Sequence, residues 1–380
     1  MLVTKFAIPE IIFGKNSLQY LGACAKRNGA NRVLLVSDPG LQAAGWVDRV
    51  LEHLDTSGLN WVYFDRVNSN PRDHQVHAGA EFYLQQRADV IVALGGGSPM
   101  DLAKGIALIA SNGGQVSEYE GANRIQKPLP PMIFIPTTAG SGADISQFAI
   151  INDVDRGVKM SIISRTLTPN ISIIDPNCLL TKPDWLIVAS AVDALCHAVE
   201  GYLSRISSPF TEMHSLRAIE LIMQNLQPAM EKRSQQHLSN LSTASTVAGM
   251  SFSNAGLGMV HSIAHALGGM FDVMHGSVHS ILLPAVMRFN QGECTAKMAA
   301  VGRIICGRSY ASEEDCAKAG VDSLQGFFQE LGVPMRLREI IQDRSRLTEV
   351  SKLAVQDACG LTNPRHVTEE DCLAVCEGVW

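Results

Sequence analysis

The chain has 380 residues, of which 46% are hydrophobic and 18% charged, and its formal net charge is -6. This length is enough for two domains, each with its own core. The acidic balance and the absence of a lysine- or arginine-rich run argue against nucleic acid as the main partner. The sequence shows no apolar stretch of membrane-span length and no signal-peptide pattern, so we expect no membrane partner.

The nine cysteines are scattered, odd in number and free of any C-x-x-C motif. In a chain of this size, that usage favours reduced thiols over a disulfide framework and predicts a cytoplasmic protein. Cys196 adjoins a candidate metal ligand, but neighbouring side chains on a helix point about 100° apart. We therefore interpret Cys196 as a packing residue.

The first half alternates short apolar runs with helical stretches. Strands are predicted within residues 31–40, 59–65, 88–99 and 130–142, and helices within residues 73–87 and 100–110. Strands that are apolar along their whole length, separated by helices, predict a parallel sheet covered on both faces. An edge strand is expected within residues 1–15, where it would offer a dimer contact.

The pattern changes after about residue 184. The remaining sequence has few β-branched runs and many amphipathic stretches with helical spacing. We predict an α/β, Rossmann-like dinucleotide-binding domain over residues 1–184 and an all-helical metal-binding domain over residues 185–380.

A glycine loop, Gly95-Gly96-Gly97-Ser98, follows a predicted strand and opens a helix. Glycines let the backbone approach a phosphate, and the first amides of the helix favour an anion. Pro99 at an early helical position and Asp101 in the first turn fit a helix start. The loop is not G-x-G-x-x-G, and a tight structural turn is the alternative interpretation.

Three further polar side chains stand at the ends of predicted strands. Asp38 can accept hydrogen bonds from the adenosine ribose and would repel a 2′-phosphate, which favours NAD over NADP. Thr137 and Thr138 end the fourth predicted strand, where ligands bind in open α/β sheets. All three residues are also common in turns, so a structural role is the alternative.

The second half carries a candidate metal site. Asp193 and His197 are four residues apart, which places them on one face of a helix. His261, His265, His275 and His279 follow in a segment poor in charge. One carboxylate and several imidazoles suit Fe(II), Zn, Mn or Co. The alternative, a set of separately satisfied core histidines, leaves many imidazoles in an apolar region without a ligand.

The motifs together resemble the iron-containing (group III) alcohol dehydrogenases almost from end to end. The matching segments are GGGSPMDLAK (95–104), IPTTAGSGAD (135–144), VDALCHAVEGY (192–202), SNAGLGMVHSIAHALGG (253–269) and HGSVHSILLP (275–284). NPRDHQVHAGAEFY and ADISQFAII make the chain most similar to the ErcA-like branch. The resemblance implies the dehydroquinate synthase-like, iron-containing alcohol dehydrogenase fold and a homodimer or larger homo-oligomer.

The resemblance also implies roles for individual residues. Asp193, His197, His261 and His275 match the metal ligands, and His265 matches a candidate catalytic histidine near the nicotinamide. Phe148 and Phe252 match positions that line the substrate pocket. The positions matching cofactor contacts are Asp38, Asn70, Gly95, Gly96, Gly97, Ser98, Asp101, Thr137, Thr138, Lys159, Leu179, Thr181 and Lys182.

The sequence departs from the family pattern in three places. Ser141-Gly142-Ala143-Asp144 replaces the usual T-G-S-E, and Met274 replaces a proline. His279 replaces a common asparagine four residues after His275. On one helix face, His279 is able to approach the metal or its surroundings, or to hydrogen-bond a neighbour. We expect the hydrogen bond to a neighbour.

The implied activity is reversible hydride transfer between a primary alcohol, or its aldehyde, and NAD. Fe(II) is the expected metal, with Zn(II) or another divalent ion as alternatives, and it would act as a Lewis acid on the alcohol oxygen. His265 would pass the proton to solvent.

Three alternative functions make different demands on the sequence. A dehydroquinate-synthase-like lyase would need a basic cluster beside the histidines, and a glycerol dehydrogenase-like enzyme would carry a different ligand pattern. The third is a regulatory or sensor protein of alcohol oxidation that retains the dehydrogenase site.

Overall fold

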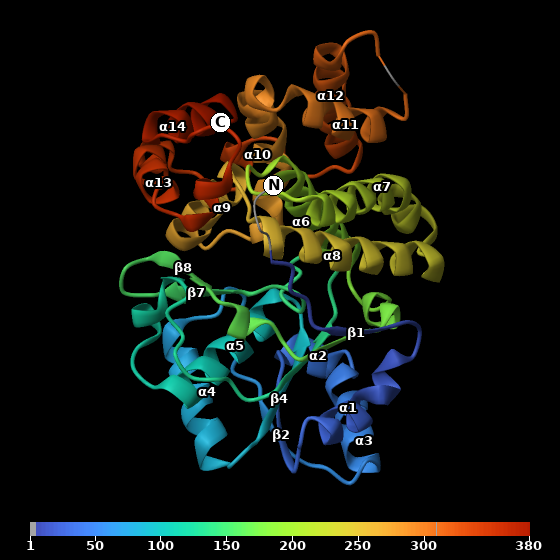
Figure 1. Cartoon of the computed structure of the whole chain (residues 1–380), viewed down its shortest axis with the longest axis vertical. Helices are drawn as coiled ribbons and strands as arrows, with labels where there is room; N and C mark the ends of the chain where they lie inside the picture. The colour runs from blue at the N-terminus through green and yellow to red at the C-terminus, as the bar shows by residue number, and fades with distance from the viewer. Residues whose placement is uncertain (1–4, 309) are drawn as a thin grey trace. The chain divides into compact units, whose positions relative to one another are not determined.

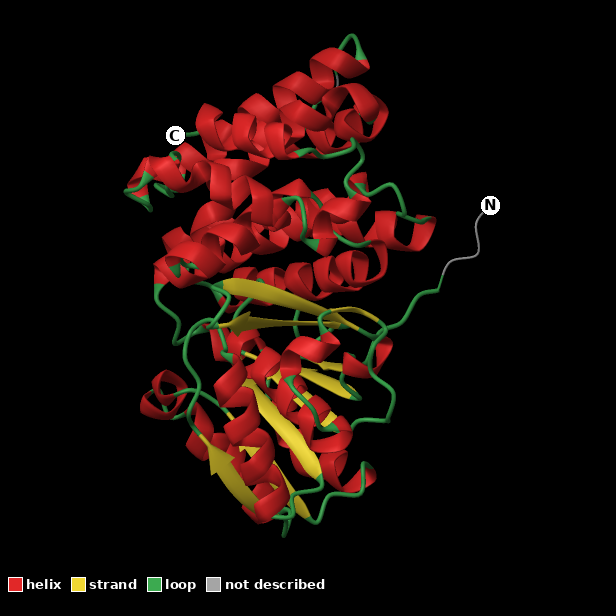
Figure 2. Cartoon of the chain, turned by 90° about the vertical axis from the view of Figure 1, so that its left-hand side faces the viewer, coloured by secondary structure: helices red, strands yellow, loops and turns green. Residues whose placement is uncertain are grey.

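The computed structural model describes residues 5–308 and 310–380. The chain separates into two compact units, with the boundary between Pro183 and Asp184, one residue before the predicted one. Lys5 and Phe6 group with the second unit, and the first unit begins at Ala7. Strands occupy the first unit, whereas the second is built from helices (Figures 1 and 2). The predicted fold class is confirmed.

The first unit contains a six-stranded parallel sheet in the order β1-β9-β6-β4-β2-β3. The strands of this sheet are β1 (Glu10–Phe13), β2 (Arg32–Val36), β3 (Asn60–Phe64), β4 (Val90–Gly95), β6 (Met132–Pro136) and β9 (Ile171–Ile174). The connecting helices are α1 (Leu21–Arg27), α2 (Pro39–Ala43), α3 (Trp46–Thr56), α4 (Asp73–Gln85) and α5 (Gly97–Asn112).

Alternate residues of each central strand enter two different cores. In β4, Val90 and Val92 pack into one core, together with Val50 of α3. Ile91 packs into the other core, together with Ile106 of α5. Burial on both faces explains why these strands are apolar along their whole length. The covered parallel sheet is therefore as predicted.

Three local expectations need correction or completion. A second sheet, β5-β8-β7, was not predicted; β5 (Gly121–Ala122) is parallel to β8 (Val158–Ile163), and β8 is antiparallel to β7 (Phe148–Asp153). Helix α5 begins at Gly97, so Asp101 lies in its second turn and not in the first. β1 does lie at an edge of the main sheet, while residues 1–4 of the expected edge segment lie outside the described residues.

The second unit places the longest apolar helix in its interior. Its helices are α6 (Asp184–Leu203), α7 (Pro209–Lys232), α8 (Gln235–Ala255), α9 (Met259–Phe271), α10 (His275–Asn290), α11 (Thr295–Cys306), α12 (Glu313–Glu330), α13 (Leu347–Ala354) and α14 (Glu369–Gly378). α6 is long and apolar enough to cross a membrane by length and composition, a feature that the sequence analysis missed. However, 89% of its apolar window is buried inside the structure, as in a core helix.

Close helix packing in this unit depends on glycine. A side chain at Gly276, at the start of α10, would place its Cβ 2.6 Å from the carbonyl oxygen of Ala189 in α6. The contact is with backbone, which has little freedom to move away. Gly276 therefore allows α10 to approach α6 closely. The same approach brings His275, the preceding residue, close to α6.

Candidate metal centre

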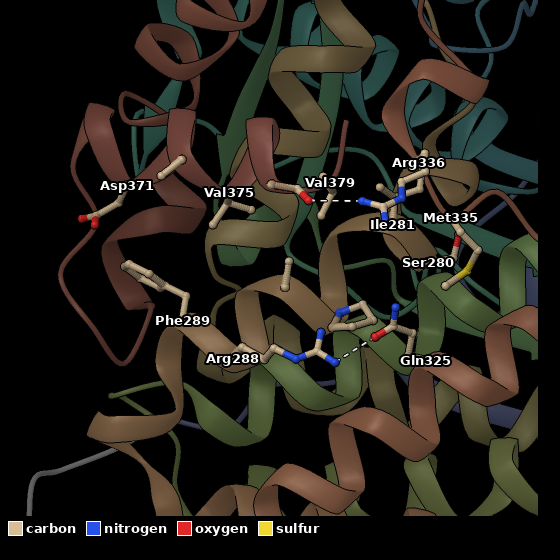
Figure 3. A pocket seen from close by; sticks show the side chains of 14 residues that line it. Ser280, Ile281, Arg288, Phe289, Gln325, Met335, Arg336, Asp371, Val375 and Val379 are labelled. Atoms are coloured by element: carbon tan, nitrogen blue, oxygen red, sulfur yellow. Dashed lines mark hydrogen bonds between the residues drawn. The ribbon is translucent and has the colours of Figure 1, made fainter.

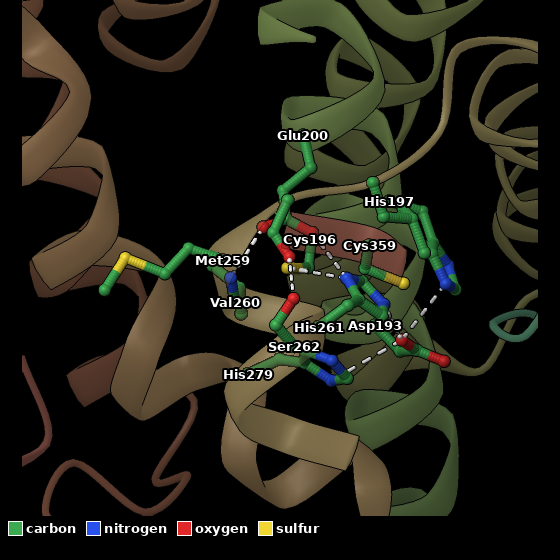
Figure 4. A network of polar contacts seen from close by, with 12 residues as sticks. Asp193, Cys196, His197, Glu200, Met259, Val260, His261, Ser262, His279 and Cys359 are labelled. Carbon is green, nitrogen blue, oxygen red and sulfur yellow. Dashed lines mark hydrogen bonds and ion pairs between the residues drawn. The ribbon is translucent and has the colours of Figure 1, made fainter. Parts of the chain in front are cut away.

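Three helices each contribute an i, i+4 pair of polar side chains to one region of the second unit. α6 carries Asp193 and His197, α9 carries His261 and His265, and α10 carries His275 and His279. Side chains four residues apart lie on the same helical face. We call Asp193, His197, His261, His275 and His279 the Asp193 cluster; several of its members are visible in Figure 4.

The Asp193 cluster surrounds one carboxylate oxygen. Asp193 Oδ1 lies 3.7 Å from Nε2 of His197, 3.6 Å from Nε2 of His261 and 3.4 Å from Nδ1 of His279. Donors that bind one tetrahedral ion at about 2.0–2.2 Å lie roughly 3.3–3.6 Å from one another. The separations from His261 and His279 fall within this range, as expected of atoms that share an ion, and that from His197 lies just above it.

Buried donor atoms of the cluster lack hydrogen-bond partners. Asp193 Oδ1, His261 Nε2 and both ring nitrogens of His279 are buried and unsatisfied. Native proteins pair the large majority of such atoms, because an unpaired one costs about 1–3 kcal/mol. A divalent cation would satisfy these atoms together, so the residues present fit a metal.

Electrostatics act differently on three members of the cluster. Burial alone would raise the pKa of Asp193, but the surrounding imidazoles, His197 foremost, hold it well below its usual range. Burial would lower the pKa of His261, but Cys196 and Glu200 raise it well above its ordinary value, so a metal bound there would displace a proton. Burial lowers the pKa of His279 well below its ordinary value. An ionised carboxylate and a neutral imidazole are the forms that bind metals.

Within the described residues, a four-donor group with mutual separations of at most 4.8 Å contains Asp193, His261, His275 and His279. His197 is outside that group but stacks on His261, with ring centroids 4.5 Å apart. The structure thus places three of the four predicted ligands in one donor group with His279, while the fourth, His197, has its Nε2 3.7 Å from Asp193 Oδ1. The expectation that His279 hydrogen-bonds a neighbour was wrong, because neither ring nitrogen makes a hydrogen bond.

Glu200 was missed by the sequence analysis, and it orients His261. Its Oε2 lies 2.5 Å from His261 Nδ1, and its Oε1 accepts a hydrogen bond from the Val260 amide at 2.7 Å. A carboxylate on one ring nitrogen leaves the other free to bind a metal. The available sequence signal was spacing, since Glu200 lies two helical turns after Asp193. Cys196 is buried, with its Sγ 3.9 Å from His261 Nδ1.

His265 stands beside the Asp193 cluster and has its own carboxylate partner. Its ring stacks on that of His275 at 5.4 Å, and its Nδ1 lies 2.8 Å from Asp357 Oδ2. Asp357 also accepts a hydrogen bond from the Cys359 amide. Burial would raise the pKa of Asp357, but His265 and these hydrogen bonds lower it. Asp357 lies 92 residues from His265, and no sequence pattern linked the two.

The two predicted pocket phenylalanines lie in different units. Phe252 of α8 is buried and stacks on His197, with ring centroids 4.2 Å apart. Phe148 begins β7 in the first unit, where its carbonyl accepts a hydrogen bond from Lys104. Phe252 therefore covers one face of a candidate ligand.

The predicted cofactor residues gather at the carboxyl ends of the parallel strands. Gly95 ends β4, and Gly96 caps α5 against Thr138, where a Cβ would lie 3.1 Å from the threonine hydroxyl. Thr137 donates its amide hydrogen to the Gly95 carbonyl at 2.8 Å. A side chain at position 96 would therefore crowd Thr138, and glycine keeps the two segments close.

Two further groups of cofactor candidates form within the first unit. Lys159 Nζ donates to Asn70 Oδ1 at 2.7 Å, and the Asn70 amide donates to Ser98 Oγ at 3.2 Å. Asp38 caps α2 through the Leu41 amide. Burial lowers the pKa of Lys182, an effect that Asp38 opposes. Thr181 accepts a hydrogen bond from Trp46, and Leu179 is buried at the end of a short 3-10 helix.

A separate cavity of about 450 Å³ lies among α10, α12 and α14 (Figure 3). Its guanidinium groups are already partnered: Arg288 donates to Gln325 and Asp322, and Arg336 donates to the Gly378 carbonyl. The cavity shares no described residue with the Asp193 cluster. It is therefore not part of the candidate metal centre.

Two family profiles match nearly the whole sequence. The profile described as iron-containing alcohol dehydrogenase matches residues 9–176, and that described as Fe-containing alcohol dehydrogenase family, C-terminal, matches residues 187–380. The chain belongs to the iron-containing alcohol dehydrogenase family. It is an alcohol–aldehyde oxidoreductase, and the predicted iron and NAD are confirmed at the level of the family.

Individual relatives cover almost the full chain. It is similar to the NAD-dependent methanol dehydrogenase of Bacillus methanolicus, with 33% identity over 97% of this chain and 98% of that protein. The 1,3-propanediol dehydrogenase of Citrobacter freundii is 35% identical over 96% of each. A solved 1,3-propanediol oxidoreductase has a TM-score of 0.96 at 33% identity, covering 100% of both chains. These comparisons support neither the ErcA-like branch nor the regulatory alternative.

Proposed function

We propose that this dehydrogenase interconverts primary alcohols and their aldehydes at the Asp193 cluster, with NAD as hydride carrier. The observation that carries this proposal is the set of unsatisfied buried donors around Asp193 Oδ1. Similarity to a methanol dehydrogenase and a 1,3-propanediol dehydrogenase supports a small primary alcohol or diol as the substrate.

The Asp193 carboxylate and the imidazoles of His197, His261 and His275 would hold Fe(II). When bound, the metal supplies Lewis-acid chemistry toward the alcohol oxygen. Glu200 keeps the His261 ring in the orientation that presents Nε2 to the cluster. Phe252 stacks on His197 and keeps water from that face of the ring.

His265 is suited to receive the alcohol proton. An ionised carboxylate only accepts hydrogen bonds, so Asp357 places the hydrogen on His265 Nδ1 and leaves Nε2 able to take a proton. Oxidation transfers a hydride from the carbinol carbon to NAD⁺, and the hydroxyl proton passes to His265 and then to solvent. The products are the aldehyde, NADH and one proton.

The first unit would bind the cofactor through backbone and side chains. The amides that begin α5 would face the pyrophosphate, as at other helix N-termini near phosphates. Asp38 would accept hydrogen bonds from the ribose hydroxyls. Lys159, held by Asn70, would add a positive charge beside the same loop.

The deciding experiment measures NADH formation by anaerobically purified, Fe(II)-reconstituted protein across primary alcohols and diols, with metal content determined on the same sample. Turnover should track iron occupancy. His261→Ala should lose both metal and turnover, whereas His265→Ala should keep the metal and slow turnover roughly 100-fold or more. Full activity without bound metal would refute the metal-centred function, and an unchanged rate in His265→Ala would remove that residue from proton transfer.

We also propose a cytoplasmic homodimer. Support comes from the position of β1 at an edge of the main sheet, with Phe13 45% exposed, and from the scattered free cysteines. A second copy would cover an edge that otherwise presents unpaired backbone groups. Light scattering of the purified protein tests the dimer, and a monomeric mass would contradict it. Fractionation of native cells tests the location, and recovery outside the soluble cytoplasmic fraction would contradict it.

A further inference from the structure

His279 is the most deeply buried member of the Asp193 cluster. Its side chain has no solvent exposure, and neither ring nitrogen makes a hydrogen bond. Its Nδ1 lies 3.4 Å from Asp193 Oδ1, the shortest of the three imidazole distances to that oxygen. A histidine that served only to fill the core would leave two buried polar atoms unsatisfied, which folded proteins rarely tolerate.

The surrounding rings place His279 inside the ligand group. Its ring centroid is 4.6 Å from that of His261 and 4.5 Å from that of His275. It lies four residues after His275 on α10, the same spacing that links Asp193 and His197 on α6. Figure 4 shows His279 and His261 converging on the Asp193 carboxylate from two helices.

We propose that His279 is an additional metal ligand of this chain, alongside Asp193 and the imidazoles of His197, His261 and His275. The proposal rests on the metal centre of the proposed function. It is not a consequence of the family pattern, which commonly has an asparagine at this position.

A fourth imidazole ligand should change which divalent metals the site prefers. Nitrogen donors favour later first-row metals such as Co(II) and Zn(II) over Fe(II) and Mn(II) more strongly than amide or water oxygens do. An additional protein donor also leaves fewer positions for substrate or water. We therefore expect this chain to discriminate between metals differently from a variant with asparagine at position 279.

The test compares wild-type protein with His279→Asn, each loaded anaerobically with Fe(II) and separately with Zn(II). X-ray absorption at the metal edge should count four imidazoles in wild type and three in the variant. Competition with a chelator should show a loss of metal affinity of at least about tenfold. His237→Asn is the matched control, because His237 already has a partner, Asn225, at 2.8 Å. It should change neither measurement.

The outcomes separate this proposal from the proposed function. Equal imidazole counts and equal affinities in wild type and His279→Asn would overturn the assignment of His279. If His261→Ala also binds metal as tightly as wild type, the metal centre itself fails. Should His279→Asn not fold, His279→Gln serves as the second variant, and three imidazoles in the wild-type protein would by itself overturn the proposal.

Discussion

Each unit contains a buried polar cluster, and the two clusters differ in whether their polar atoms have hydrogen-bond partners. In the first unit, the fully buried Lys104 donates to the carbonyls of Ser146 and Phe148 at 2.8 and 2.6 Å. In the second unit, Asp193 Oδ1 and both nitrogens of His279 have no hydrogen-bond partner. The contrast separates a cluster that the chain completes by itself from one whose unpaired donor atoms an ion would satisfy.

The surroundings of Lys104 are consistent with a structural role. Burial lowers the pKa of Lys104 to about 8, opposed by Asp101 and Asp144. Burial raises the pKa of Asp101 to about 6, opposed chiefly by Lys104. Asp144 in turn accepts a hydrogen bond from Ser172 at 2.6 Å. Each of these three charged side chains therefore has an opposite charge or a hydrogen-bond partner within the unit.

Metal removal should produce the largest effect and act on the second unit alone. Chelation is expected to abolish turnover and to lower the free energy of unfolding by about 4 kcal/mol, relative to protein with free metal near 1,000 times its Kd. Hydrogen exchange should accelerate in α6, α9 and α10 and stay unchanged in α5. Unchanged unfolding after complete metal removal would show that the Asp193 cluster is stable without an ion.

Lys104→Met should destabilise the first unit without affecting the metal. The change leaves two carbonyls and the charges of Asp101 and Asp144 without their cation, which is expected to cost roughly 3 kcal/mol. Chemical denaturation measures the loss, and metal analysis should show full occupancy. Lys26→Met is the control, because Lys26 is exposed on α1 of the same unit. A stability equal to that of wild type would contradict the structural role of Lys104.

Asp38→Asn should give the smallest effect, a change in cofactor choice. Asparagine caps a helix about as well as aspartate, so α2 should remain intact. The ratio of kcat/KM for NADP to that for NAD should rise about tenfold, because the charge that repels a 2′-phosphate is gone. Melting temperature serves as the control for the cap. A constant ratio would limit Asp38 to its capping role.

The sequence predicted the α/β unit well because a strand of a parallel sheet that is buried on both faces has apolar residues along its whole length. Residues 33–36 and 90–94 are apolar throughout, and alternate residues enter the two cores. The antiparallel pair β7 and β8 was missed.

Part of the metal centre could also be read from local spacing. Asp193 and His197 are one helical turn apart, and so are His275 and His279, so each pair shares a helical face before any tertiary contact forms. The expectation for His279 failed because the same spacing fits both a ligand and a histidine paired with a neighbour. Only the surrounding atoms distinguish the two.

What the sequence determined by itself was the order of the two units, the helix and strand periodicities and the residue types able to bind a metal and a nucleotide. These features depend on neighbours within a few residues along the chain. The tertiary structure decided which donors share one carboxylate oxygen, and it paired Glu200 with His261 and Asp357 with His265. Such pairings join residues far apart in sequence: Glu200 of α6 meets His261 of α9, and Asp357, which follows α13, meets His265 of α9.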